Sequence, residues 1–230
     1  MNRSSKKVDL TIMTVIYPEA EKYFDKFRSS MNNQKCSNFR IVVICDGDKN
    51  LAKRFGKKLS REILFVFRSK TKLANRIDGL KFIKKKKFPL ISFLDIDDYP
   101  NNNFVGSVIS FAKKNKQENL FSNLLVCKNI KFQKKKVLKI NDLIEEHTIG
   151  YGTLVIRASY INNLINMSKY NVYFFDWFIS LGYLVKKERI LINTKTKINY
   201  LNKQITTLRY NSKFDQYTIK ELLKKKINLF

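Results

Sequence analysis

The sequence has few of the residues that break or cross-link a chain. It contains 7 glycines, 3 prolines and 3 cysteines among 230 residues, and no segment is rich in glycine, serine or proline. We therefore expect one compact domain without a flexible linker, since single cores extend to about 200–250 residues. Cys36, Cys45 and Cys127 are odd in number and lack paired spacing, which argues against a disulfide framework and favours reduced thiols in a cytoplasmic protein.

Long apolar runs are also missing. The first seven residues are polar, and the longest apolar candidate, 172–185, is interrupted by Asp176. A membrane span needs about 18 apolar residues or more, so any membrane attachment is expected to be peripheral, at the inner face of the cytoplasmic membrane. The sequence has one histidine, His147. A single histidine without cysteine partners argues against a zinc site and favours a structural role.

Acidic residues are scarce relative to basic ones. Lysine and arginine total 46 against 19 aspartates and glutamates, which gives a formal net charge of +27. The expected partner is anionic, and nucleic acid, an acidic membrane leaflet and a phosphate-bearing substrate all qualify. A general bias toward lysine in the source organism's proteins explains much of this charge as well as an anionic partner does. The lysine runs at 84–87, 134–136 and 224–226 are interpreted as solvated faces that together suit an anionic leaflet.

Apolar runs without strict alternation predict buried strands separated by helices. In the first half, strands are expected at 10–17, 40–45, 63–67 and 90–94, and a helix at 72–87. This order predicts an α/β fold with a mostly parallel sheet covered by helices on both faces. The second half is less regular, with helices expected near 104–114, 159–167 and 176–184, strands near 120–127, 152–156, 189–193 and 198–201, and a basic helix from about 214.

The strand at 90–94 is followed directly by three aspartates and one isoleucine, in the order Asp95, Ile96, Asp97, Asp98. Such a cluster at the carboxyl end of a central strand lies where open α/β sheets bind ligands. Magnesium and similar ions take one or two carboxylates together with substrate phosphate oxygens. An aspartate-rich turn that caps the next helix is an equally good explanation from the pattern alone.

Other polar residues follow the first two strands. Asp46 ends the strand at 40–45 and precedes Gly47, while Thr14 and Tyr17 close the first strand. An acid at Asp46 is suited to accept hydrogen bonds from a base or ribose, although Asp-Gly is also a common turn signal. On a parallel sheet these residues share one edge with the three aspartates.

Taken in order, these segments resemble family 2 glycosyltransferases of the GT-A fold. The segment TIMTVIYPEAEKYF resembles the family's opening strand and helix, FRIVVICDGD resembles FEIIIVDDGS, and ANRIDGLKFIKKKKFPLISFLDIDD resembles ARNxGI and YIAFLDADD. The segments EEHTIGYGTLVIRASYI and YFFDWFISLGYLV are similar to the family's acceptor-side strand and its EDWDLWLRL helix. The resemblance implies a single GT-A domain with a nucleotide-sugar half at about 8–100, an acceptor half at about 101–213 and a basic C-terminal helix at 214–230.

The resemblance also implies roles for individual residues. Asp95 and Asp97, with Asp98 as an auxiliary, would form the DxD site for Mn²⁺ or Mg²⁺, and Asp176 would be the catalytic base of an inverting transfer. A pocket for a nucleoside diphosphate sugar, expected to be a UDP-sugar, would be lined by Thr14, Tyr17, Asp46, Arg76 and Lys203. The implied acceptor is a cell-envelope glycan or a lipid-linked molecule, of the kind found in lipopolysaccharide or capsule.

The sequence departs from the family pattern at several positions. Cys45 stands where the family often has an aspartate, Phe175 replaces the glutamate before Asp176, and Lys203 stands near an expected histidine. A charged lysine does not ligate a metal but can hold a diphosphate. Asp176 also suits a helix N-cap, and the pair Glu145 and Glu146 suits either a solvated helix end or an acceptor contact.

Two other function classes fit the composition. A basic nucleic-acid-binding domain would explain the charge, but no helix-turn-helix, stacking-strand motif or zinc spacing is present. A nucleotidyltransferase would use the same kind of sheet and carboxylates. It would favour a glycine-rich loop after the first strand, and residues 14–17 contain no glycine.

Overall fold

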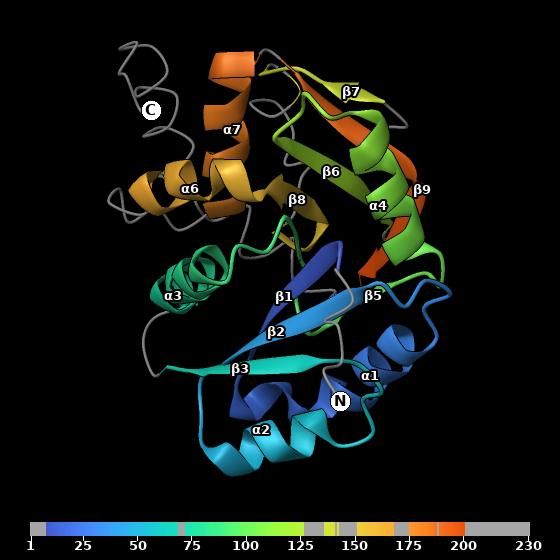
Figure 1. Ribbon diagram of the computed structural model, residues 1–230, viewed down its shortest axis with the longest axis vertical. Coiled ribbons are helices and arrows are strands. Elements are labelled where there is room, and N and C mark those ends of the chain that lie inside the picture. The colour runs from blue at the N-terminus through green and yellow to red at the C-terminus, as the bar shows by residue number, and fades with distance from the viewer. Residues whose placement is uncertain are drawn as a thin grey trace, which may run out of the picture.

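A computed structural model describes residues 8–68, 72–126, 136–140, 142, 151–167, 175–187 and 189–200. A single mixed sheet runs through this part of the chain in the order β3-β2-β1-β4-β8-β6-β9-β5, with β7 beside β9 (Figure 1). The predicted α/β fold, a largely parallel sheet flanked by helices, is confirmed. No helix in the described ranges is long and apolar enough to cross a membrane.

The first half of the sheet is parallel. It consists of β1 (Leu10–Ile16), β2 (Phe39–Cys45), β3 (Ile63–Phe67) and β4 (Leu90–Phe93). These strands match the predicted runs to within a residue or so, because their uninterrupted apolar sequences bury both faces. Their carboxyl ends lie at one edge of the sheet.

The second half is mixed in direction. Strand β8 (Leu154–Arg157) runs antiparallel to β4, β6 (Leu120–Val126) runs antiparallel to β8, and β9 (Ile190–Tyr200) runs parallel to β6. Two short strands, β5 (Asp98–Pro100) and β7 (Val137–Leu138), pair with β9 in antiparallel fashion.

Strand β9 corrects one expectation. Two short strands were predicted at 189–193 and 198–201, but the structure has one strand with a shift of register. Asn123 of β6 lies opposite Asn193, whereas Leu124 lies opposite Lys197. The intervening residues bulge out of the ladder, and Thr196 Oγ1 donates to Asn123 Oδ1 at 2.8 Å. A bulge interrupts the apolar pattern without ending the strand.

Helices cover both faces of the sheet (Figure 1). Helices α3 (Lys72–Lys85), α6 (Ile161–Met167) and α7 (Phe175–Lys187) pack on one face. Helices α1 (Phe24–Asn32), α2 (Lys49–Gly56) and α4 (Phe104–Lys114) pack on the other. Three short 3₁₀ turns adjoin strands: η1 (Pro18–Tyr23) comes after β1, η2 (Tyr151–Thr153) precedes β8, and η3 (Ala158–Tyr160) connects β8 to α6.

The spacing of apolar residues predicted most of the helices. Helix α2 was not predicted, and a capping residue marks its start. Ile77, Leu80 and Ile83 of α3 are buried, as their spacing predicted. Helix α2 was not predicted because lysine and arginine separate its few apolar residues. Asp48 begins it by accepting a hydrogen bond from the amide of Leu51 at 2.7 Å.

Candidate active site

Backbone hydrogen bonds outside the strand pairing connect the carboxyl ends of β1, β2 and β4. The amide of Asp46 donates to the carbonyl of Ile16 at 2.8 Å, and the amide of Leu94 donates to β1 at 3.1 Å. Tyr17, Asp46 and Asp95 lie one or two residues beyond these strand ends. The structure therefore brings them to one edge of the sheet, as the sequence predicted.

Arg76 reaches this edge from α3. Its Nη2 donates to Asp95 Oδ1 across 3.0 Å, and the two side chains are 20% and 32% exposed. Gly79, one turn later, allows the helix to lie close to the sheet, because a Cβ there would come within 2.7 Å of Ile44 Cδ1 and 3.0 Å of Met13 Sδ. Arg76 and Asp95, to which the family resemblance gave separate pocket and metal roles, thus form an ion pair.

Two tyrosines lie in the field of the aspartates. Burial raises the pKa of Tyr17, and the negative charges of Asp97 and then Asp95 raise it further. Burial followed by the charge of Asp97 raises the pKa of Tyr99 to about 12. Both phenols stay protonated at neutral pH and retain an O–H donor beside the carboxylates. Asp97, whose charge acts on both tyrosines, is itself half-buried.

Asp98 is buried, with 1% of its surface exposed, and lies against Gly152. A Cβ placed on Gly152 would overlap Asp98 Oδ2 and would lie 3.0 Å from Asp98 Cγ and 3.4 Å from the amide nitrogen of Asp95. The amide of Asp98 donates to the carbonyl of Asp95 at 3.0 Å and closes a turn. Gly152 was not singled out from the sequence, because only the antiparallel pairing of β8 with β4 reveals that it faces these acids.

Asp46 and Thr14 occupy different environments. Asp46 is half-buried beyond the end of β2. Thr14 lies inside β1, 1% exposed, and its hydroxyl has no hydrogen-bond partner among the described residues. Cys45, the last residue of the neighbouring strand β2, has its pKa raised to about 11 by burial and by the charges of Asp48 and Asp46.

The described contacts do not connect two of the predicted site residues, Asp176 and Lys203, to the residues at the carboxyl edge of the parallel strands. Asp176 is the second residue of α7, a helix that packs on the same face of the sheet as α3 through Ile179 and Tyr183, but its side chain is outside the described residues. Lys203 also lies outside them, as do His147 and the adjacent pair of glutamates.

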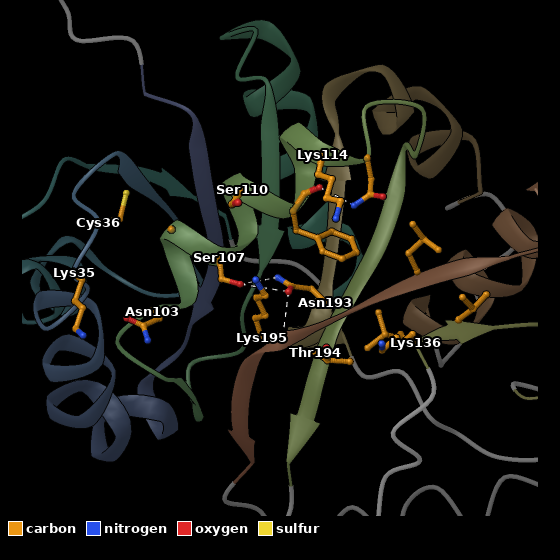
Figure 2. A pocket seen from close by; sticks show the side chains of 16 residues that line it. Lys35, Cys36, Asn103, Ser107, Ser110, Lys114, Lys136, Asn193, Thr194 and Lys195 are labelled. Carbon is orange, nitrogen blue, oxygen red and sulfur yellow. Dashed lines mark hydrogen bonds between the residues drawn. The ribbon is translucent and has the colours of Figure 1, made fainter.

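A cavity of about 610 Å³ lies away from the aspartates, between α4 and β9 and beside β7 (Figure 2). None of the predicted site residues lines it. Its lining includes the apolar side chains of Phe111, Leu191 and Ile192 and an exposed valine, Val137. Its lining includes four exposed lysines from four separate segments and no carboxylate: Lys35, Lys114, Lys136 and Lys195.

The profile of the family described as Glycosyl transferase family 2 matches residues 11–182. The chain belongs to glycosyltransferase family 2. This membership covers more than half of the sequence and extends from β1 into α7. It favours the transferase over the nucleic-acid-binding and nucleotidyltransferase alternatives.

Solved structures with this fold agree with the membership. TarS of S. aureus, residues 1–349 in complex with UDP-GlcNAc, superimposes with a TM-score of 0.61 at 16% identity over 93% of this chain and 65% of that one. GalNAc-T7 in complex with UDP, GalNAc and Mn²⁺ gives a TM-score of 0.62 at 10% identity over 86% and 45%. The chain thus has the GT-A fold and spans less than two thirds of the length of these structures. No curated protein matches the chain.

The acid turn of this family 2 member, residues 95–98, fits a metal ion only in part. No group of three or more histidine, cysteine, aspartate or glutamate side chains converges within the described ranges. Asp95 and Asp97 are half-buried at the open edge, whereas Asp98 is buried against Gly152. Since Mg²⁺ commonly uses one or two carboxylates and completes its coordination with phosphate oxygens and water, two carboxylates suit an ion that arrives with a diphosphate.

Proposed function

We propose that the protein transfers a sugar from a nucleoside diphosphate donor, a UDP-sugar, to a hydroxyl of a cell-envelope glycan or lipid-linked acceptor with inversion. The observation that carries this proposal is the convergence of Arg76, Tyr17 and the acid turn at the carboxyl edge of the parallel strands. Membership of a glycosyltransferase family supports it, as do similar structures that contain UDP, UDP-GlcNAc or Mn²⁺.

The donor nucleotide is assigned to the edge between β1, β2 and α3. In this proposal Asp46 accepts hydrogen bonds from the base or ribose, while Thr14 and Tyr17 line the pocket. Arg76 faces the diphosphate with a planar cationic fork that matches phosphate geometry, and Lys203 adds a point charge. Residues 8–100 form the donor half and 101–213 the acceptor half, a division that stays a prediction.

Asp95 and Asp97 are the residues proposed to hold Mn²⁺ or Mg²⁺, with Asp98 as an auxiliary. A bound divalent ion would neutralise charge on the leaving diphosphate. Arg76, already 3.0 Å from Asp95, would stabilise the same charge, and such placed charges usually provide the largest share of catalysis.

Asp176 is proposed as the general base. Its carboxylate takes the proton from the acceptor hydroxyl while that oxygen forms a bond to the anomeric carbon. The bond from the anomeric carbon to the diphosphate oxygen breaks on the opposite side, and the electron pair leaves with UDP. In-line attack of this kind inverts the anomeric configuration, and Asp176 carries the released proton.

The cavity between α4 and β9 supports an anionic, partly apolar partner. Its lining combines apolar side chains with lysines, which suits a lipid with an acidic headgroup better than a fully polar polyanion that would leave the apolar side chains uncovered. We therefore propose that this face contacts the inner leaflet of the cytoplasmic membrane, where a lipid-linked acceptor would be found.

A thermal-shift panel tests the function. The purified protein is heated with UDP, GDP, CDP, dTDP, ATP and a single-stranded oligonucleotide, each with and without Mn²⁺. A ligand selective for the native state raises the melting temperature by mass action. Stabilisation by UDP that depends on Mn²⁺ is expected. Stabilisation by the oligonucleotide alone would reject the proposal.

A further inference from the structure

Gly152 lies opposite the acid turn because of the register between two strands. Leu90 of β4 pairs with Arg157 of β8, and Ser92 pairs with Val155, in antiparallel order. Continuing this register by three more residues on each strand places Gly152 opposite Asp95, which comes after the end of β4. The turn η2, which contains Gly152, therefore meets the acid turn although more than fifty residues separate them in sequence.

The turn η2 is itself firmly placed. Ser122 Oγ of β6 donates to Thr153 Oγ1 at 2.9 Å, and both side chains are fully buried. A hydrogen bond between two buried hydroxyl groups helps to fix the position of this turn, because water cannot replace it there. Gly152 is thus held from the acceptor side of the sheet while it faces Asp98.

Space, rather than backbone conformation, requires glycine at this position. None of the glycines in the described ranges has a positive φ, so alanine is compatible with the backbone of residue 152. The niche left by the missing side chain is filled by the Asp98 carboxylate, which a Cβ would overlap. A single methyl group at residue 152 therefore displaces one specific side chain.

We propose that Gly152 is a positioning residue for the acid turn. Its niche seats the Asp98 carboxylate, and the hydrogen bond from the Asp98 amide to the Asp95 carbonyl then holds Asp95 toward Arg76. The acceptor-side segment thereby sets the geometry of the donor-side acids. This inference rests on the proposed donor site, because it assigns the acid turn a role in binding UDP.

A double-mutant cycle tests the inference in the full chain. Gly152→Ala is expected to weaken binding of UDP in the presence of Mn²⁺ by on the order of tenfold or more, a loss typical of residues that support metal ligands. Asp98→Ala removes the overlapping carboxylate, so adding Gly152→Ala to it should change neither UDP affinity nor melting temperature further. Gly106→Ala in α4 is the matched control, because its Cβ would meet only Cys36 Cβ at 3.5 Å. It should bind UDP as the wild type does.

Independent effects of the two substitutions, or wild-type affinity in Gly152→Ala, would overturn the proposal. If Gly152→Ala fails to fold but the double variant folds, the result supports the proposal that the Asp98 carboxylate occupies the niche at Gly152. If neither variant folds, this proposal is rejected. The melting temperatures of the four proteins in the cycle can be measured without UDP. If the wild-type protein does not bind UDP with Mn²⁺, the proposed function fails, while these temperatures still decide whether residues 98 and 152 compete for one space.

Discussion

Arg76 and Asp95 form an ion pair that bridges α3 and the carboxyl end of β4, with 3.0 Å between Nη2 and Oδ1. Both side chains are mostly shielded from solvent, so the pair is screened less than one on the open surface. Close packing of α3 on the sheet at Gly79 positions the arginine. A guanidinium held in place before the donor arrives can stabilise a leaving diphosphate without reorganisation.

Two substitutions of Arg76 distinguish the contribution of its charge to catalysis from that of its planar geometry. Arg76→Ala is expected to lower kcat by about 10²–10³, the usual cost of losing one charge-stabilising donor. Arg76→Lys should recover part of this loss, since it restores the charge but not the planar fork. The kcat of both variants is measured from the steady-state release of UDP from a UDP-sugar donor. Unchanged kcat in Arg76→Ala would remove this residue from the mechanism.

Asp176→Asn tests the general base without changing side-chain size. If Asp176 accepts the acceptor proton, kcat should fall by about 10²–10⁴ while UDP binds as in the wild type. Asp25→Asn, at an exposed aspartate of α1, is the matched control and should keep full activity. Full turnover by Asp176→Asn would assign the base to another residue.

The parallel half of the fold was predicted well from the sequence for a physical reason. Strands buried on both faces are long apolar runs, and the polar residues that come after them, such as Asp46 and Asp95, stand out clearly. Periodicity correctly placed Ile77, Leu80 and Ile83 on the buried face of α3.

The remaining features depend on long-range pairing that periodicity does not encode. The bulge in β9 splits one strand into two apparent ones. The contact between Gly152 and Asp98 depends on β8 pairing with β4, and a lone glycine has no spacing that signals such a contact.

Charge reversal tests the role of the lysines that line the cavity between α4 and β9 (Figure 2). The double variant Lys114→Glu and Lys195→Glu should lose most of its binding to vesicles that contain phosphatidylglycerol, because each basic residue near an anionic surface contributes about 1 kcal/mol. Lys49→Glu and Lys53→Glu, two exposed positions on α2, change the net charge equally. Co-sedimentation measures binding. Equal losses in both double variants would show that net charge alone attracts the membrane.

Thiol reactivity should differ sharply between Cys45 and Cys36. Burial and neighbouring aspartates raise the pKa of Cys45 to about 11, so little thiolate forms at pH 8, whereas Cys36 is half-buried. Site-resolved mass spectrometry after alkylation at pH 8 should find Cys36 modified and Cys45 intact. Because the pKa is raised on folding, the resulting stabilisation is complete below the unfolded pKa and is lost as the pH rises through about 11. Rapid labelling of Cys45 at pH 8 would contradict its burial.

The most direct test of the donor site is a calorimetric titration of UDP in Mn²⁺ against wild type, Asp97→Asn and the control Asp25→Asn. Asp97→Asn keeps the side-chain size but removes the charge, so UDP affinity should fall on the order of 10–100-fold, whereas the control should match the wild type. Chelation of Mn²⁺ with EDTA should weaken wild-type binding to a similar extent. Equal affinity of Asp97→Asn and wild type for UDP in Mn²⁺ would contradict the proposal that the acid turn holds the divalent ion that binds the diphosphate.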